Sequence, residues 1–205
     1  MTDDPLSDDV GDDRLVTRIA CGDAAALSTL FRRRQADVYR VAMLMTGSAA
    51  SAEDVTQDVF LAVMNDASRF DAGRATVIAW LCGIARNHAR RRLERDRRLV
   101  PLPEPLEPLV PSAVVHADPL NELSNAQQIE SLRRAILALP VRYREVVVLC
   151  DLQDLSYADA AAALECSSGT IRSRLHRGRA LLTAKMRAHE AARSATVKKI
   201  SRCLA

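Results

Sequence analysis

Aromatic residues and strand-like patterns are both scarce in this chain of 205 residues. Phe, Trp and Tyr together make up 3% of the sequence, so the hydrophobic content of 48% comes mainly from Leu, Val, Ile and Ala. Aliphatic residues of this kind favour small helical bundles, and no segment alternates between apolar and polar residues as a half-buried strand does. We therefore expect an all-α protein.

The cysteines, histidines and apolar runs argue against a disulfide-bonded protein, a metalloprotein and a membrane-spanning protein. The five cysteines are odd in number and scattered without a CxxC pair, and the four histidines do not cluster with them at zinc spacing. We therefore expect reduced thiols, no metal and no cofactor. No apolar run approaches the ~18 residues of a membrane span, and the acidic N-terminus is the opposite of a signal peptide. These features predict a cytoplasmic protein with no direct membrane insertion.

The net charge is only +3, but charges of opposite sign are segregated along the chain. Residues 1–13 hold six aspartates and no base, whereas residues 86–98 carry seven arginines against two acids. Residues 170–205 contain ten Lys or Arg residues and one acid. A solvated helix face usually mixes charges because like charges four residues apart repel. A face of one sign instead predicts a polyanionic partner, whose phosphates release counterions on binding.

Apolar periodicity predicts four helices, a connection rich in proline and acid, and four more helices. Six of the eight prolines fall within residues 99–119, where no Lys or Arg occurs. Proline fixes φ and removes a backbone donor, so we expect this connection to act as a spacer between two domains. The predicted parts are a disordered acidic N-terminus (1–13), a first helical domain (14–98), a flexible linker (99–124), a second helical domain (125–187) and a basic tail (188–205).

The second predicted domain ends in two helices joined by a tight turn. Ser156 and Asp159 form a capping-box pattern before a run of alanines, and turn residues separate this run from a helix beginning at Thr170. Advancing 100° per residue places apolar residues on one face of that second helix and basic or hydrogen-bonding residues on the other. The apolar face holds Ile171, Leu175, Gly178 and Leu182, and the opposite face holds Arg172, Ser173, His176 and Arg177.

This arrangement is typical of a helix-turn-helix whose second helix enters the DNA major groove. The alternative is an amphipathic hairpin with a solvated arginine face, which the excess of bases argues against. Gly178 interrupts the recognition helix at a cost of ~1 kcal/mol in helix propensity. The sequence leaves open whether residues 188–205 extend this helix or trail along DNA.

A mixed surface is predicted on the third helix of the first domain. Ser51 and Asp54 form a second capping-box pattern, which predicts a helix over residues 52–67. One side of this helix is both acidic and apolar, as expected of a partner surface, although solvated acids would give the same pattern. Its residues are Asp54, Gln57, Asp58 and Leu61.

The next predicted helix changes character along its length. It follows a loop that contains Phe70 and runs over residues 76–98, with an apolar first half and a second half that is almost all arginine. Trp80 lies in the apolar half, so core packing is its expected main role. Aromatic stacking and cationic grooves are the usual means of binding unstacked bases, which makes this segment a candidate for single-stranded DNA.

Two pairs of segments resemble conserved regions of bacterial sigma factors. AEDVTQDVF (52–60) and WLCGIARNHARRRL (80–93) are similar to the second conserved region. LPVRYREVVVL (139–149) and LSYADAAAALECSSGTIRSRLHRGRALL (155–182) are similar to the fourth. The short extracytoplasmic-function (ECF) group of the sigma-70 family has only these two regions and a linker, which is also the organisation of this chain.

The resemblance implies a role for each set of residues. It implies that the third helix binds the clamp of core RNA polymerase through Asp54, Gln57, Asp58 and Leu61. It implies that the −10 promoter element is read and opened by Phe70, Trp80, Arg86, Asn87, Arg90 and Arg91. In this set Asn87 would recognise a base edge, whereas the arginines would hold phosphates. It implies that the −35 element is contacted by Thr170, Arg172, Ser173, Arg174, His176 and Arg177.

The implied function is that of an alternative sigma factor that binds core RNA polymerase, recognises both promoter elements and promotes melting. An enzyme is not expected, because no paired carboxylates, phosphate-binding loop or activated nucleophile is visible. Family members are commonly held inactive by an anti-sigma factor, so one is expected as a partner beside polymerase and promoter DNA. The alternatives are a stand-alone helix-turn-helix regulator and a helical adaptor that binds no DNA.

Overall fold

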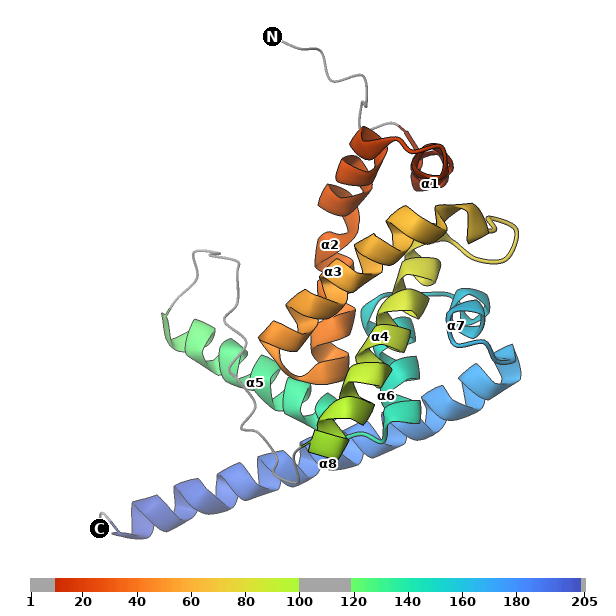
Figure 1. The fold of residues 1–205 in the computed structure, drawn as a ribbon. Helices are drawn as coiled ribbons and strands as arrows, with labels where there is room; N and C mark the ends of the chain where they lie inside the picture. The colour runs from red at the N-terminus through yellow and green to blue at the C-terminus, as the bar shows by residue number, and fades with distance from the viewer. Residues whose placement is uncertain (1–9, 100–118, 204–205) are drawn as a thin grey trace.

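The computed structural model describes residues 10–99 and 119–203, and the regular elements in these ranges are all helical (Figure 1). The first range contains α1 (Asp12–Ala20), α2 (Ala24–Thr46), α3 (Ala49–Asp66), the 3-10 turn η1 (Ala67–Arg69) and α4 (Val77–Leu99). The second contains α5 (Pro119–Leu137), α6 (Val141–Val147), the π-helical segment η2 (Val148–Leu152), α7 (Tyr157–Ala163) and α8 (Ser168–Cys203). The prediction of an all-α fold with four helices on each side of the connection is confirmed.

Helices α2, α3 and α4 pack on one another to form the core of the N-terminal half (Figure 1). On α2, Val38, Val41 and Met45 recur at helical spacing and are buried, and Val55 and Val59 do the same on α3. Burying an aliphatic side chain of this size contributes about 1.5–3 kcal/mol, so aliphatic residues can build this core without many aromatic rings.

Helix α3 begins earlier than the sequence predicts. Helix α2 ends at Gly47, whose φ of 81° lies in the left-handed region that glycine adopts without steric cost. The Oγ of Ser48 then accepts a hydrogen bond from the backbone N–H of Ser51 at 3.4 Å, so Ser48 caps α3. The predicted capping box of Ser51 and Asp54 is therefore wrong, and Asp54 lies within the helix.

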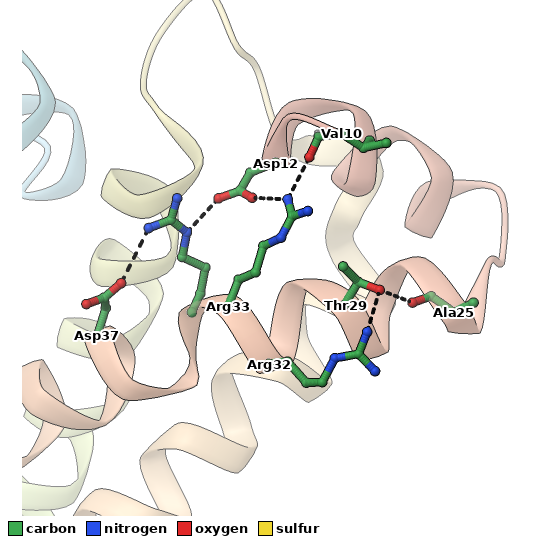
Figure 2. A network of polar contacts seen from close by, with 8 residues as sticks. Val10, Asp12, Ala25, Thr29, Arg32, Arg33 and Asp37 are labelled. Carbon is green, nitrogen blue, oxygen red and sulfur yellow. Dashed lines mark hydrogen bonds and ion pairs between the residues drawn. The ribbon is translucent and has the colours of Figure 1, made fainter. Parts of the chain in front are cut away.

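A network of polar contacts holds α1 against α2 (Figure 2). The Nη1 atom of Arg33 donates to the carbonyl of Val10 at 2.6 Å and to Oδ1 of Asp12 at 3.3 Å. The Nε atom of Arg34 donates to the other oxygen of Asp12 at 2.6 Å. The prediction of disorder over residues 1–13 is therefore wrong for its last residues, because two arginines fix Asp12; residues 1–9 lie outside the described chain.

In the C-terminal half, α8 packs closely across α6 at Gly178. A Cβ atom at this position would lie 2.8 Å from Cγ2 of Val147 and 3.4 Å from the carbonyl oxygen of Tyr143. The absence of a side chain therefore allows the two helices to approach, and Ile171 and Leu175 of α8 are buried in the same half. Gly178 interrupts a favourable helix sequence because the packing requires it.

Two predicted domain boundaries are corrected by the helices themselves. Helix α4 includes Leu99 and α5 begins at Pro119, so both ends of the predicted linker (99–124) are helical. The rest of that linker, residues 100–118, lies outside the described chain. Helix α8 continues to Cys203, so the basic tail extends the recognition helix. Among the helices described, none has both the length and the apolar composition that crossing a bilayer requires.

The two halves are packed together, although the sequence predicts a spacer between separate domains. Helix α4 of the first half lies against α7 of the second, and α2 contacts α5 and α6 (Figure 1). The contact between α4 and α7 is close because a Cβ on Gly83 would lie 3.1 Å from the carbonyl oxygen of Ala163. The described residues therefore form one body with two helical halves.

Candidate nucleic-acid interface

The turn between α7 and α8 is fixed by side-chain caps on both helices. The Oγ of Ser156 accepts from the N–H of Asp159 at 3.0 Å and donates to its carboxylate at 2.7 Å, in agreement with the predicted cap. The Oγ of Ser167 accepts from the N–H of Thr170 at 3.2 Å. Between the helices, Glu165 adopts a φ of 52°, which reverses the chain over a few residues. These caps and the conformation of Glu165 together fix the orientation of α8 relative to α7.

The basic face of α8 points away from the core. Ile171, Leu175 and Gly178 are buried, whereas the opposite residues are exposed, namely Arg172, Ser173, His176 and Arg177. Thr170 and Arg174 are half-buried at the edges of this face. These are the first two turns of the second helix in a helix-turn-helix, the part that enters the major groove in such motifs.

Two neighbouring arginines are held by groups on α6 and η2. A hydrogen bond from the Arg177 guanidinium lowers the pKa of Tyr143, so one side of Arg177 is anchored to the α6 surface. The Nη2 atom of Arg179 lies 2.5 Å from Oδ1 of Asp151, and its Nε contacts both carboxylate oxygens. The charge of Arg179 is therefore paired within this half of the chain.

A cleft of about 560 Å³ lies beside α4 and gathers four residues of the predicted −10 set. The rings of Phe70 and Trp80 pack against one another with centroids 5.2 Å apart. Asn87 and Arg91 lie further along α4 and line the same cleft. Trp80 is half-buried, so it serves both as packing and as part of the cleft wall. The far wall comes from the C-terminal half, through Ala162, Ala163 and Glu165.

The other two residues of the −10 set turn toward the C-terminal half. The Nε atom of Arg86 donates to Oε1 of Glu145 on α6 at 2.8 Å, and Nε of Arg90 lies 4.0 Å from the same oxygen. Arg86 also donates to Oδ1 of Asn87 at 2.9 Å. Glu145 is buried, so its pair with Arg86 is shielded from solvent. The contact with Glu145 was not predicted, because Glu145 is 59 residues away from Arg86 in sequence.

The mixed face of α3 splits into two parts. Asp54 forms an ion pair with Arg92, and Oδ2 of Asp58 lies 3.3 Å from Nδ1 of His88, so both acids lean toward α4. Both carboxylates remain nearly half exposed. Gln57 and Leu61 turn instead toward α2.

Gln57 and Leu61 line an apolar groove of about 500 Å³ between α2 and α3. Its floor contains Phe31 and Phe60, whose rings meet edge to face with centroids 4.8 Å apart. Leu61 is 54% exposed and Met64 is 51% exposed, which is unusual for large apolar side chains on adjacent turns. Sequence reasoning missed the groove because Phe31 fits the apolar stripe of α2, and periodicity cannot separate a core face from an exposed one. The remaining lining residues are Leu27, Ser28 and Arg32.

Cys21, Cys82, Cys150 and Cys166 have free thiols, and two of these thiols are shielded from reaction. Burial raises the pKa of Cys82 to about 12 and that of Cys150 to about 11, which suppresses the reactive thiolate. No group of His, Cys, Asp and Glu side chains within residues 10–96 and 128–188 is arranged to hold a metal ion.

A helix-turn-helix whose second helix exposes a basic face is the arrangement found in DNA-binding transcription proteins. Two family models match the chain: "Sigma-70 region 2" over residues 30–99 and "Sigma-70, region 4" over residues 129–182. The first covers α4 with its cleft, and the second covers the helix-turn-helix. Both halves are thus matched in the predicted order.

Known relatives agree with these matches. The ECF RNA polymerase sigma factor SigE of Mycolicibacterium smegmatis is 35% identical over 188 residues, which cover 86% of this chain and 69% of the relative. SigM of Mycobacterium tuberculosis is 34% identical over 172 residues, or 83% of this chain and 82% of the relative. The solved structure of CnrH in complex with the cytosolic domain of CnrY superimposes with a TM-score of 0.63 at 27% identity, covering 86% of this chain and 97% of CnrH.

The chain belongs to the ECF RNA polymerase sigma factors of the sigma-70 family. It is an alternative sigma factor, and its function lies in transcription initiation. The family identified from the sequence is confirmed.

Proposed function

We propose that the chain binds core RNA polymerase through α3 and the groove beside it, and directs the enzyme to promoters through two separate DNA-reading surfaces. The single observation that carries this proposal is the pairing of an aromatic cleft on α4 with an exposed basic face on α8. One surface suits unstacked bases and the other suits a duplex groove.

The cleft on α4 is the proposed −10 site. The Phe70–Trp80 pair offers an aromatic surface on which an extruded base can stack, which is worth about 1–3 kcal/mol per base. Asn87 carries an amide that can donate to and accept from one base edge. The flanking arginines, Arg86, Arg90 and Arg91, would neutralise phosphates and thus position the strand without reading it. Melting is favoured when the free energy of binding a base in the cleft exceeds the free energy of its stacking and pairing in the duplex.

The exposed face of α8 is the proposed −35 site. A guanidinium can bind both acceptors of a guanine edge, which gives about 1–3 kcal/mol of discrimination for each good pair. Arg172 and Arg177 are exposed and can provide such contacts, while Ser173 and His176 between them can reach neighbouring bases. Thr170 and Arg174 lie at the edges of the face and would contact phosphates.

The groove between α2 and α3 is the proposed polymerase site. Its exposed Leu61 and Met64 suit an amphipathic helix with apolar residues on one stripe, because such a helix can bury both side chains at once. Asp54 and Asp58 lie on the side of α3 that faces α4 and remain partly exposed, so basic residues of a partner helix that extends past the groove would be attracted to them. Gln57 lies between the two parts and can hydrogen-bond the partner backbone.

The remaining features of the proposal follow from the family and its relatives. An anti-sigma factor is a further proposed partner, because the similar protein CnrH was solved in complex with CnrY. The chain is proposed to act in the cytoplasm, where core polymerase and promoter DNA are found. The chain itself is proposed to catalyse no reaction, since the polymerase supplies the chemistry.

Run-off transcription with purified core polymerase on a selected pool of promoters tests the proposal. The wild-type chain should direct initiation at a shared pair of elements, and Asn87→Ala should lose preference at one −10 position. Arg40→Ala removes an exposed arginine on α2, away from the cleft, and serves as the matched control. Tight binding to duplex DNA without any start-site selection would instead identify a stand-alone regulator.

A further inference from the structure

His88 lines the cleft on α4 but has no role in the proposed function. It follows Asn87 in the sequence and shares the cleft with Asn87 and Trp80. Its side chain is 26% exposed, so the protein encloses most of the imidazole and leaves part of it open to a ligand. A partly enclosed imidazole beside the proposed base-reading amide is well placed to contact a bound base.

His88 lies at the border of the cleft face, on the side nearer to α3. Advancing 100° per residue from Trp80 places Asn87 at about −20° and His88 at about +80° around α4. Asn87 is therefore in the middle of the cleft face, whereas His88 is at its edge, where Asp58 of α3 contacts it. A base bound against the Asn87 side chain has the imidazole as its neighbour on the α3 side.

The carboxylate of Asp58 determines which nitrogen of the imidazole carries a proton. Oδ2 of Asp58 lies 3.3 Å from Nδ1 of His88. A carboxylate can only accept hydrogen bonds, so Nδ1 must donate the proton in this contact. In the neutral imidazole Nε2 is then unprotonated and can only accept. The contact with Asp58 therefore leaves His88 with one hydrogen-bond acceptor for a ligand.

Both side chains of this pair are carried by rigid backbone. Val59, next to Asp58 on α3, and Ala89, next to His88 on α4, are fully buried in the core. Groups on packed helices are held more precisely than groups on loops. The acceptor on His88 is therefore fixed in position before a ligand arrives, and it can reject a ligand that offers no donor.

The ligand that suits this acceptor is a base and not a phosphate. With a neutral imidazole, the pair of His88 and Asp58 has one negative charge, which repels a phosphate. Adenine and cytosine carry an exocyclic amino group where guanine and thymine carry a carbonyl oxygen. Nε2 can accept a hydrogen bond from the amino group, whereas its lone pair would face the lone pairs of the carbonyl oxygen.

We propose that His88, positioned by Asp58, gives the cleft on α4 a preference for an extruded base with an exocyclic amino group, adenine or cytosine, over guanine or thymine. The proposal deepens the proposed function and rests on it, because the cleft is the proposed −10 site. His88 contacts the base through Nε2, and Asp58 acts through His88 as a positioning residue. The Asp58 side chain is 45% exposed, so it can also take part in binding polymerase.

Three substitutions test the two residues separately. His88→Ala removes the acceptor, whereas His88→Gln can turn either its carbonyl or its amide toward a base and should bind without preference. Asp58→Ala leaves the imidazole free to carry its proton on either nitrogen. Arg92→Ala is the matched control, because it breaks the neighbouring α3–α4 ion pair with Asp54 and lies outside the residues that line the cleft.

The assay measures the fluorescence anisotropy of labelled single-stranded oligonucleotides bound by the chain assembled with core polymerase. It is run at pH 8, which favours the neutral imidazole. The oligonucleotides carry the −10 sequence from the run-off assay with A, C, G or T at each position in turn. At one position the wild type should bind A or C about tenfold more tightly than G or T.

A second set of oligonucleotides removes only the amino group at that position. Purine replaces adenine, or pyrimidin-2-one replaces cytosine, and either change should weaken binding by about the same factor. The preference is a ratio of affinities, so it does not depend on the fraction of chains that assemble with polymerase. A loss of preference in Asp58→Ala is therefore separate from any loss of polymerase binding.

The preference should fall to about one in His88→Ala, His88→Gln and Asp58→Ala. Arg92→Ala should keep the wild-type preference, even where it binds every oligonucleotide more weakly. A preference that persists in both His88 variants would overturn the role of His88, and one that persists in Asp58→Ala would overturn the positioning role. A preference for guanine or thymine that depends on His88 would overturn the assignment of Nε2 as an acceptor.

Failure of the proposed function would give a different result. A wild-type chain that neither selects start sites nor binds any of the oligonucleotides would overturn the proposed function, and the role of His88 with it. A wild-type chain that selects start sites but shows no preference for amino bases at any position would overturn the role of His88 alone.

Discussion

Replacing Gly178 by Ala should raise helix propensity but also introduce a steric clash. The structure shows which of these two effects on stability is larger. Alanine is favoured over glycine in a helix interior by about 1 kcal/mol, so propensity alone predicts a more stable protein. The added Cβ would lie 2.8 Å from Cγ2 of Val147, whereas carbon atoms in contact are about 3.5–4.0 Å apart. Val147 is buried and β-branched, with one strongly preferred rotamer in a helix, so it cannot simply rotate away.

The packing effect is the larger of the two. Forcing an extra carbon into a filled core typically costs about 1–3 kcal/mol. Subtracting the gain in propensity leaves a net destabilisation of about 1 kcal/mol for Gly178→Ala, or a fall of roughly 2–4 °C in Tm for a chain of this size. Removing the obstructing methyl groups with Val147→Ala should reverse the sign, so that Gly178→Ala becomes stabilising in that background.

Urea unfolding followed by far-UV circular dichroism measures these effects as shifts of the midpoint at constant slope. The four chains needed are the wild type, each single variant and the double variant, which form a double-mutant cycle. Gly169→Ala is the matched control on α8, because the nearest neighbour of its added Cβ is Oγ of Ser167 at 3.8 Å, an ordinary contact distance, and it should not lower the midpoint. A more stable Gly178→Ala single variant, or additive effects in the cycle, would refute the packing argument.

Three further predictions concern binding and pH. Arg172→Ala and Arg177→Ala should each weaken transcription by roughly 5- to 150-fold in a manner that depends on the −35 sequence, as expected for about 1–3 kcal/mol of base discrimination; an equal loss on every promoter would mean that these arginines contact only phosphates. Asp58→Arg should reduce the capture of core polymerase because it reverses a charge on α3 close to the α2–α3 groove. The same change at the exposed Asp13 of α1 should leave capture unchanged and is the control. Undiminished capture by Asp58→Arg would contradict the assignment of α3 as the polymerase-binding surface. Partial burial raises the pKa of Asp159, but the hydrogen bonds from Ser156 and from the backbone and hydroxyl of Thr76 together outweigh it and leave the pKa lowered. Its folded pKa is therefore below the ordinary 3.8, so the α7–α4 contact is fully stabilised above about pH 4 and weakens as pH falls through the lowered value. Protection of the Thr76 amide should follow this dependence and lose it in Asp159→Asn; a pH-dependent variant would point to another group.

Local sequence patterns predicted the features of the fold that local chemistry determines. The capping box of Ser156 and Asp159 is present with both of its side-chain contacts. The basic face of α8 is exposed as the 100° rotation per residue requires. Each of these features depends on residues a few positions apart.

Features that depend on distant residues could not be read from those patterns. Asp12 is ordered only because Arg33 and Arg34 reach it from α2. The carboxylate that pairs with Arg86 comes from α6, and the arginine that holds the Met45 carbonyl lies 99 residues away. Hydrophobic periodicity marks Phe31 as apolar without showing that its side is an open groove. The packing of the two halves against each other is made entirely of such distant contacts.

Helix α8 also has a mechanical consequence. It continues without interruption from the recognition turns at Ser168 to Cys203, a length of about 54 Å at 1.5 Å per residue. A continuous helix of this kind has no hinge between its two ends, and it is held about a third of the way along its length, where Gly178 lies against α6. A force on the distal turns, for example from a protein fused to them, is therefore transmitted along the helix to the turns proposed to read DNA. The helix would rotate about its contact with α6 at Gly178.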